Sequence, residues 1–246
     1  MKIGVLADIH SNLPALNVVL QDLAAEQVDG YLVLGDLVGY GPYPNECIEI
    51  LQKLPNADII VGNHDWAAIE LEDISLFNEE ARQAILWTRS VLSKEMIEYL
   101  GSLEYLLNKN QYMMVHGSPR DPLDEYLVNI ERFEKNIPAL KADICFVGHS
   151  HLPLYFFKQK ENGTAAMRAV NDQEILNLAL GTIHVINPGS VGQPRDHDAR
   201  ASYGIFDSQA LTFVQKRKAY DIAMVQIRMR EQQLPPSLID RLAEGI

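Results

Sequence analysis

The sequence predicts an α/β protein built on two sheets. In the N-terminal part, three short apolar runs each stop at a polar loop, and helix-like segments follow, which is typical of parallel strands joined by helices. From Leu154 onward, short apolar runs alternate with Asn-Gly, Pro-Gly and Asp-Ser turns, which is typical of antiparallel strands. The chain has 246 residues, 47% of them hydrophobic, so it can bury a core without a disulfide or a structural metal.

The N-terminal elements follow from the spacing of apolar residues. The run at 2–7 predicts a buried strand, and Leu and Val at helical spacing predict a helix over 13–26. The runs at 30–34 and 58–61 predict two further strands, with a helix expected between them over 44–54. These three units indicate a parallel sheet.

The rest of the chain changes character twice. Residues 66–107 have helical spacing almost throughout and are expected to form an insertion over the strand ends, before strands that end at His116 and Gly148. Further strands are expected around 155–157, 184–186, 203–206 and 211–214. Helices over 220–230 and 236–242 are expected to form the closing segment, 220–246. No linker or repeat divides the chain, so residues 1–246 are predicted to be one domain.

The charge balance limits the partners. There are 33 Asp and Glu residues against 21 Lys and Arg residues, a formal net charge of −12, which argues against binding to a nucleic-acid backbone or an anionic membrane. A small phosphorylated substrate remains compatible if bound metal ions supply local positive charge. Cys47 and Cys145 lie in apolar stretches and are expected to be reduced core residues of a cytoplasmic protein. No signal or membrane-spanning segment is predicted.

Histidines gather where strands are expected to end. Five of the seven lie there, and each stands next to a residue that metals or phosphates favour. The blocks, in chain order, are Asp8-Ile9-His10, Gly35-Asp36, Gly62-Asn63-His64-Asp65, His116-Gly117 and Gly148-His149-Ser150-His151. Asp-x-His alone is weak, but Gly-Asn-His-Asp is expected by chance only roughly 0.002 times in a chain of this composition. The ordered set therefore predicts a metal or phosphate site.

This ordered set resembles the calcineurin-like metallophosphoesterase superfamily. The segments Gly-Asp-Leu-Val-Gly-Tyr-Gly-Pro at 35–42 and Asn-Pro-Gly-Ser-Val-Gly-Gln-Pro-Arg at 187–195 are similar to its small prokaryotic phosphodiesterase branch. The resemblance implies a four-layer αββα sandwich of two mixed sheets that carries two divalent metal ions. Their identity is open among Mn, Fe, Zn, Ni and Co, because carboxylate and imidazole ligands suit all of them.

The resemblance also implies a role for each residue of the blocks. One metal ion would be held by Asp8, His10, Asp36 and His151. The other would be held by Asp36, Asn63, His116 and His149, so that Asp36 bridges the pair. A water activated by the two ions would attack the phosphorus of a small phosphodiester or phosphomonoester.

Two further residues are predicted to be catalytic. His64 is expected to face the substrate, where it would stabilise phosphoryl charge or protonate the leaving oxygen. Asp65 is expected to orient the ring of His64. Asn12 either caps the helix that begins near Leu13 or binds substrate. Arg195 either donates to phosphate or lies in a surface turn with an ion pair.

Two other classes of function are weighed against the phosphoesterase. The retromer scaffold subunit uses a similar fold for protein contacts, which makes a non-catalytic scaffold the main alternative. That scaffold lacks a histidine at the position of His64, so the histidine here favours catalysis. A sensor of phosphate ligands is the third hypothesis. A homodimer is compatible with the sequence.

Overall fold

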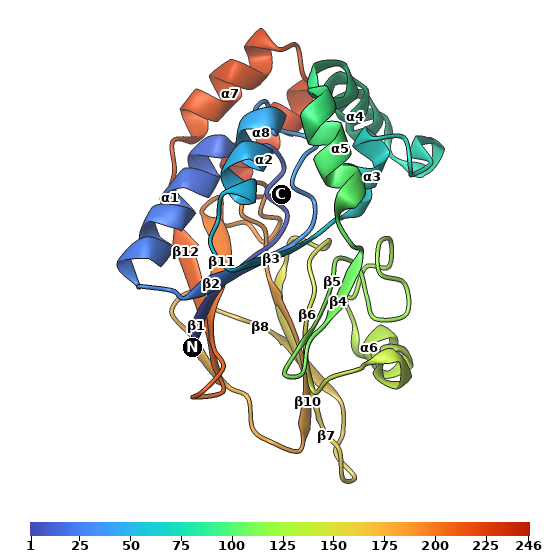
Figure 1. Cartoon of the computed structure of the whole chain (residues 1–246), viewed down its shortest axis with the longest axis vertical. Coiled ribbons are helices and arrows are strands. Elements are labelled where there is room, and N and C mark those ends of the chain that lie inside the picture. Colours follow the sequence, from blue (N-terminus) through green and yellow to red (C-terminus); the bar gives the residue numbers. More distant parts are fainter.

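The computed structural model, which describes all residues 1–246, contains two six-stranded sheets with helices outside them (Figure 1). In the first sheet the strand order is β3 (Ala57–Ile60), β2 (Gly30–Leu34), β1 (Lys2–Leu6), β11 (Ala201–Asp207), β12 (Thr212–Lys218) and β9 (Ile175–Asn177). In the second it is β4 (Leu106–Asn108), β5 (Met113–Val115), β6 (Ile144–Phe146), β10 (Thr182–Pro188), β7 (Pro153–Gln159) and β8 (Ala166–Ala169).

Both sheets are mixed, as the predicted fold requires. In the first sheet β1, β2 and β3 are parallel, which confirms the three predicted units, and β11, β12 and β9 continue the sheet with antiparallel pairs. In the second sheet β5, β6 and β10 are parallel, while β4, β7 and β8 are antiparallel to their neighbours. Parallel strands end at the same edge, so both sheets direct several loops to one end of the molecule.

Three layers of apolar contacts hold the sheets and helices together. Val5, Leu32, Phe146 and Phe206 belong to the core between the sheets. Leu16 and other residues of α1 (Leu13–Ala25) and α2 (Pro44–Gln52) cover the outer face of the first sheet. On the outer face of the second sheet the cover is α6 (Ile130–Asn136) and the turn η2 (Ile137–Ala139) that follows it. The order of layers is therefore αββα.

The predicted helical insertion consists of short helices rather than one long one. They are α3 (Asn63–Ala68), the single turn η1 (Ile74–Leu76), α4 (Glu79–Val91) and α5 (Lys94–Ser102). Asn78 and Ser93 cap α4 and α5 through their side-chain oxygens, which satisfies backbone N–H groups at each start. The closing helices are α7 (Ile222–Glu231) and α8 (Pro236–Glu244), which pack on α4.

Some elements differ from the sequence prediction. The helical region ends at Ser102, and strand β4 occupies part of the stretch expected to be helical. Strands β8 and β9 and helix α6 were not predicted. Each has seven residues or fewer, so none is long enough to show a clear period in the sequence.

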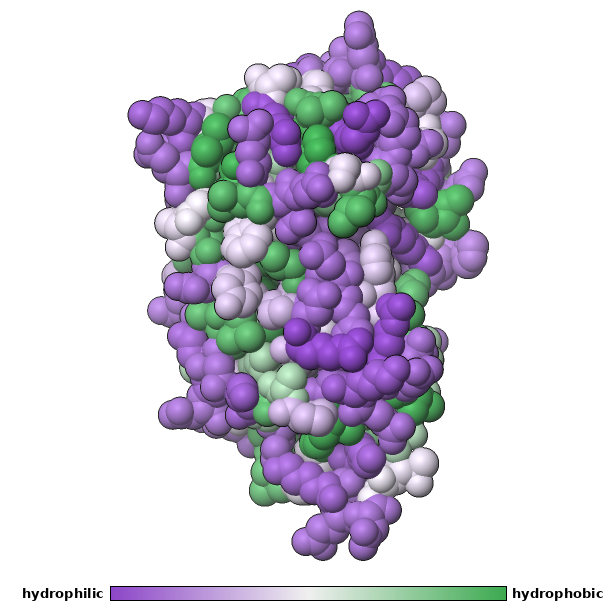
Figure 2. Space-filling view, turned by 90° about the vertical axis from the view of Figure 1, so that its right-hand side faces the viewer, coloured by the Kyte–Doolittle hydropathy of each residue, from purple (hydrophilic) through white to green (hydrophobic).

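The surface has a mixed character. On the face shown in Figure 2, hydrophilic residues predominate and hydrophobic ones lie among them in small groups. Cys47 and Cys145 are buried and unpaired, as expected. None of the helices is both long and apolar enough to span a membrane.

Candidate metal centre

Six of the seven predicted metal ligands meet at one end of the sandwich, although 143 positions separate the first from the last, and the seventh, Asn63, lines a pocket together with His149. Loops after β1, β2 and β3 in the first sheet, and after β5 and β6 in the second, carry them there. All seven are buried, with no more than 7% of any residue exposed; they are Asp8, His10, Asp36, Asn63, His116, His149 and His151. A buried group of polar side chains is costly unless partners or ions satisfy it.

The backbone of these loops turns sharply. Five of these residues have φ between 46° and 65°, in the left-handed region that non-glycine residues seldom adopt; they are Asp8, His10, Asp36, His149 and His151. Such backbone strain persists only where the surrounding structure fixes it, and it is concentrated at functional sites. Here it turns side chains that are close in sequence toward one centre.

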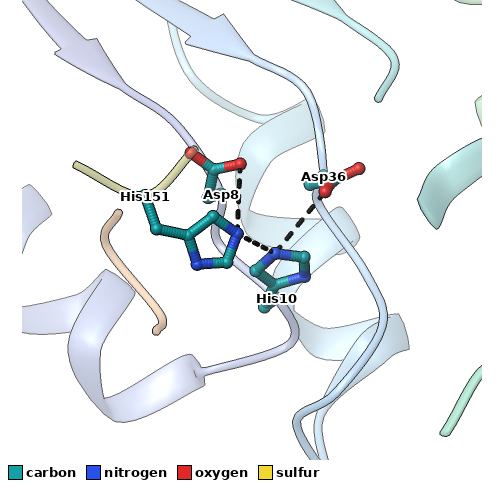
Figure 3. A group of neighbouring side chains, drawn as sticks. All are labelled: Asp8, His10, Asp36 and His151. Carbon is teal, nitrogen blue, oxygen red and sulfur yellow. Dashed lines mark hydrogen bonds and ion pairs between the residues drawn. The ribbon is translucent and has the colours of Figure 1, made fainter. Parts of the chain in front are cut away.

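Asp8, His10, Asp36 and His151 form the first group of potential ligands (Figure 3). Their ligand atoms all lie within 4.8 Å of one another. Nε2 of His10 is 3.0 Å from Nε2 of His151 and 3.5 Å from a carboxylate oxygen of Asp36. These side chains converge on one small volume.

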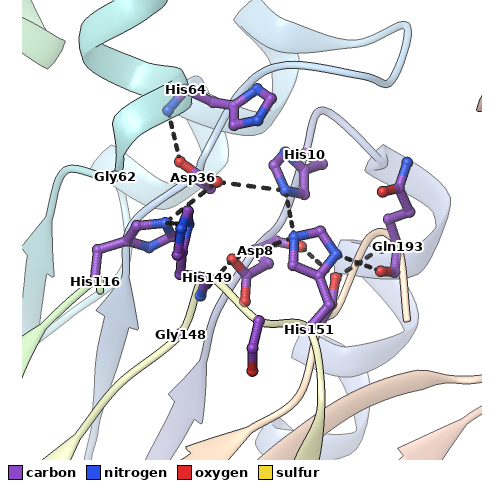
Figure 4. A network of polar contacts seen from close by, with 12 residues as sticks. Asp8, His10, Asp36, Gly62, His64, His116, Gly148, His149, His151 and Gln193 are labelled. Carbon is purple, nitrogen blue, oxygen red and sulfur yellow. Dashed lines mark hydrogen bonds and ion pairs between the residues drawn. The ribbon is translucent and has the colours of Figure 1, made fainter. Parts of the chain in front are cut away.

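Asp36, His116 and His149 form the second group (Figure 4). Nε2 of His116 is 3.3 Å from Asp36 Oδ2 and 3.2 Å from Nδ1 of His149. Asp36 therefore belongs to both groups. The side-chain oxygen of Asn63 is buried and has no hydrogen-bond partner, and the same holds for Oδ2 of Asp8.

Hydrogen bonds on the outer side of each imidazole determine which ring nitrogen faces inward. Nδ1 of His10 and of His151 lie 3.0 and 2.5 Å from the carbonyl oxygens of Val38 and Gln193. The outer nitrogens of the second group likewise reach carbonyl oxygens: Nδ1 of His116 with Leu34 and Nε2 of His149 with Asp124. A carbonyl only accepts, so each outer nitrogen carries the proton.

The inner nitrogens of neutral rings then present lone pairs to each other. Two lone pairs 3.0 or 3.2 Å apart repel unless a proton or a cation lies between them. Backbone carbonyls that fix the tautomer of a histidine are the usual outer partners of metal-binding imidazoles. The residues present, including the orphaned oxygens of Asp8 and Asn63, therefore fit divalent metal ions.

The acid–base properties of the cluster agree with this interpretation. Burial raises the pKa of Asp8 to about 7. Burial disfavours the charged form of His116, but the Asp36 carboxylate and, more weakly, Asp8 outweigh it and raise the pKa of this imidazole to about 9. Metal binding replaces the protons that such groups otherwise retain, because a metal takes the deprotonated ligand.

Comparisons with known proteins agree with the geometry. The profile of the calcineurin-like phosphoesterase superfamily domain matches residues 1–210. The chain belongs to the calcineurin-like phosphoesterase superfamily. This membership and the two His/Asp groups together indicate divalent metal ions.

Relatives of this phosphoesterase extend over nearly its whole length. An uncharacterized protein of Methanocaldococcus jannaschii, MJ0912, is 37% identical over 250 residues, which cover 99% of this chain and 98% of that protein. The phosphodiesterase YfcE of Escherichia coli K12 is 27% identical over 237 residues, 92% of this chain and 98% of that one. A solved metallophosphoesterase from Sphaerobacter thermophilus is 45% identical, with a TM-score of 0.90, over 100% of this chain and 99% of that one.

His64 lies beside the two His/Asp groups. It is 5% exposed, and its backbone N–H donates to Asp36 at 2.9 Å. The His64 ring packs at 4.4 Å from the ring of Tyr40 and at 5.1 Å from that of Phe77, measured between centroids. Burial lowers the pKa of His64 to about 4. A negative charge placed nearby would raise that pKa again, because it favours the imidazolium.

The prediction that Asp65 orients the His64 ring is wrong. The Asp65 carboxylate accepts N–H bonds from Val38 at 3.0 Å and Gly62 at 2.9 Å, and Nδ1 of His64 has no partner. Gly62 directly precedes α3, and Asp65 is the third residue of that helix. A carboxylate at this position can accept a hydrogen bond from the free backbone N–H of the residue before the helix. Asp65 therefore holds the loops after β2 and β3 together and positions Asn63 and His64 through the backbone.

The structure also shows the contacts of Asn12 and Arg195, whose roles the sequence leaves open. The Asn12 side chain accepts from Ala15 N–H and donates to Gly192, so it caps α1. Arg195 donates to the Gln193 side chain at 2.9 Å and lies over the ring of Tyr40. The ion pair expected in its turn is instead made by the next residue, Asp196, with Arg217.

A pocket of about 490 Å³ opens onto the second group, and sequence reasoning missed most of its walls. Leu76 and Phe77 line it from the insertion, and Asp124 and Tyr126 line it from the loop between β5 and α6. Asn63, His64 and His149 line it at the end next to the second group. The wall residues belong to no motif, so no sequence signal identified them.

Proposed function

We propose that this phosphoesterase is a phosphodiesterase that holds two divalent ions, with manganese as a suitable metal. The observation that carries the proposal is the pair of inward-facing imidazole contacts, His10 with His151 and His116 with His149, joined by the shared carboxylate of Asp36. The curated relative named phosphodiesterase YfcE supports the same reaction class.

Each group of side chains has a defined part in the proposed centre. Asp8, His10, Asp36 and His151 would hold one ion, and Asp36, Asn63, His116 and His149 would hold the other. When bound, the ions supply Lewis acidity and a water that deprotonates near neutral pH. The four backbone carbonyls behind the imidazoles keep the ring nitrogens in place during turnover.

His64 is proposed to give a proton to the leaving oxygen of the ester. It lies at the junction of the ligand cluster and the pocket, next to Asn63, and its ring lacks a partner at Nδ1. An imidazole in contact with an incoming anion gains the proton that this step needs. The proton moves to the ester oxygen as the bond between phosphorus and that oxygen breaks, and the leaving group departs as an alcohol.

The charge of the pocket favours a diester over a monoester. None of the ten residues that line the pocket is Lys or Arg, and one of them is Asp124. A monoester carries close to two negative charges at neutral pH and a diester carries one. The diester is therefore repelled less by the carboxylate and needs less compensation from cationic side chains.

The test begins with metal-free protein. After chelation, hydrolysis of bis-p-nitrophenyl phosphate should be lost, and added Mn²⁺ should restore it, with metal content measured by elemental analysis. His64→Ala should lower turnover by about 10²- to 10⁴-fold while the metal content stays unchanged. The matched control is His197→Asn, at an exposed histidine outside the cluster.

The outcomes separate the reaction class from its details. Equal activity of metal-free and metal-loaded protein contradicts the metal mechanism. Hydrolysis of p-nitrophenyl phosphate in preference to the diester contradicts the diester assignment alone. Metal binding without turnover on either ester would instead favour a non-catalytic role for the fold.

A further inference from the structure

The pocket beside the second group of ligands has the chemistry of a site for a flat, uncharged group. Three of its residues are aromatic, Tyr40, Phe77 and Tyr126, and the imidazoles of His64 and His149 add two more ring surfaces. Its volume, about 490 Å³, lies in the usual range for small-molecule sites. The five heavy atoms of a phosphoryl group leave most of that volume free for the ester group attached to it.

The outer wall is formed by Tyr126, whose position is fixed. The centroid of its ring lies 3.9 Å from the centroid of the His149 ring. Tyr126 is 42% exposed, so part of its surface is open to a ligand. The neighbouring Glu125 carboxylate accepts from Ser118 Oγ at 2.6 Å and from Asn136 Nδ2 at 2.8 Å. These bonds secure the loop to α6, so little ordering entropy remains to be lost on binding.

The opposite wall is formed by Phe77. It lies between two capped elements, since Asp73 accepts from Ser75 N–H at the start of η1 and Asn78 accepts from Ala81 N–H at the start of α4. The Phe77 ring contacts His64 edge to face, with centroids 5.1 Å apart. Phe77 also packs on the cluster formed by α4, α7 and α8. An ester group next to His64 therefore meets an aromatic surface.

The charges around the pocket exclude a second phosphate. Asp124 lines it, and no Lys or Arg side chain does. The nearby guanidinium of Arg195 is directed to Gln193 and the Tyr40 hydroxyl, and Arg120 pairs with Glu125. A polyphosphate chain would meet a carboxylate without a cationic side chain in the lining.

We propose that the pocket selects phosphoesters whose leaving group is an uncharged aromatic ring system, such as an aryl group or a nucleoside without further phosphates. Phe77 and Tyr126 provide the ring contacts, and Asp124 discriminates against added negative charge. The proposal rests on the proposed function, because it assigns the leaving group of the same reaction.

Binding of phosphonates to the Mn²⁺-loaded protein tests the proposal without turnover. Calorimetry should give a tighter dissociation constant for phenylphosphonate than for methylphosphonate. Removing one ring in Tyr126→Ala or Phe77→Ala should reduce that preference by about two- to tenfold, the usual effect of one aromatic contact. The loss of affinity for phenylphosphonate should exceed any loss for methylphosphonate. Tyr126 is the safer variant, because Phe77 also packs on the helices.

A ligand with an added negative charge and a control variant complete the experiment. The protein should bind p-carboxyphenylphosphonate more weakly than phenylphosphonate, and Asp124→Asn should relieve about two- to fivefold of that difference. The control is Leu71→Ala, because Leu71 is 60% exposed and does not line the pocket. It should leave every dissociation constant unchanged.

Two results overturn the proposal at different levels. Equal affinity for phenylphosphonate and methylphosphonate, with phosphodiester hydrolysis intact, overturns the aromatic site and leaves the proposed function standing. Absence of both phosphonate binding and hydrolysis in the metal-loaded protein overturns the proposed function, and the aromatic site with it.

Discussion

The proposed metal-ligand cluster lies next to the pocket wall formed by Phe77 and Tyr126, but the two are built in different ways. The cluster consists of Asp8, His10, Asp36, Asn63, His116, His149 and His151. Asp8, Asp36 and His149 belong to loops that leave parallel strands, and their positive φ angles are fixed by sheet and loop hydrogen bonds. Phe77 and Tyr126 instead belong to two excursions from the sheets, each secured by a few side-chain bonds. The fold itself therefore positions the His/Asp groups, whereas two separate segments would determine which substrate the proposed site accepts.

The largest effect is expected where both metal groups depend on one side chain. Asp36→Asn removes the shared carboxylate, and we expect the metal content to fall and turnover to drop by more than about 100-fold. Substitution of residues that only support metal ligands costs about 10- to 100-fold, so loss of a shared ligand should cost more. Elemental analysis and hydrolysis of bis-p-nitrophenyl phosphate measure both. Asp240→Asn, at an exposed position, is the control. Full metal content in Asp36→Asn would show that the two groups do not share a ligand.

The next effect tests how tightly the loops of the cluster are packed. A Cβ on Gly192 would lie 1.9 Å from the carbonyl oxygen of Ile9, which is backbone and cannot move aside cheaply. We expect Gly192→Ala to lower the free energy of unfolding by about 3 kcal/mol. The control is Gly101→Ala in α5, where the nearest atom is 3.8 Å away. If Gly192→Ala lowered the free energy of unfolding no more than Gly101→Ala does, the loops around Gly192 would not be tightly packed.

A smaller effect is expected at Glu125, in the loop that carries the wall residues Asp124 and Tyr126. Hydrogen bonds from Arg120, Asn136 and Ser118 overcome burial and lower the pKa of Glu125 to about 2. The resulting stabilisation is complete above the ordinary pKa of 4.5 and is lost as the pH falls toward 2. Glu125→Gln should therefore be less stable than the native protein by about 2 kcal/mol near neutral pH, and the gap should narrow below pH ~4.5.

Chemical denaturation at several pH values measures that gap. Metal content should not change, since Glu125 supports the loop that carries Asp124 and Tyr126 and belongs to neither His/Asp group. Glu104→Gln, at an exposed position, is the control. Its free energy of unfolding should equal that of the native protein at every pH. A gap that widens in acid would mean that the sign of the linkage is wrong.

The smallest effect distinguishes a cap from a substrate contact. Asn12 caps α1 through its side-chain oxygen, so Asn12→Ala should lower the free energy of unfolding by about 1 kcal/mol. Phosphonate affinities should stay unchanged. Asn12→Ser, which keeps a capping oxygen, should recover most of the loss. Weakened phosphonate binding in Asn12→Ala with normal stability would assign the residue to the substrate site instead.

Much of the ligand cluster was predictable because its residues stand directly after strands. The block at Asn63 is a rare local pattern, and the blocks at Asp8, Asp36 and His149 likewise follow apolar runs. Strand ends at one sheet edge converge by geometry. The role of Asp65 was not predictable, because adjacency in sequence suggested a contact with the His64 ring that the helix start does not make. The choice between roles of Asn12 needed the observed bonds to Ala15 and Gly192.

The sequence by itself determined the two sheets, the αββα resemblance and the residues from which a metal site can be built, because apolar periods and short polar motifs are local properties of the chain. Only the tertiary structure decided which nitrogen of each imidazole faces inward and which rings enclose the pocket. Those features depend on contacts such as His149 with Asp124 and Phe77 with His64, which form only when distant or unpatterned segments pack together.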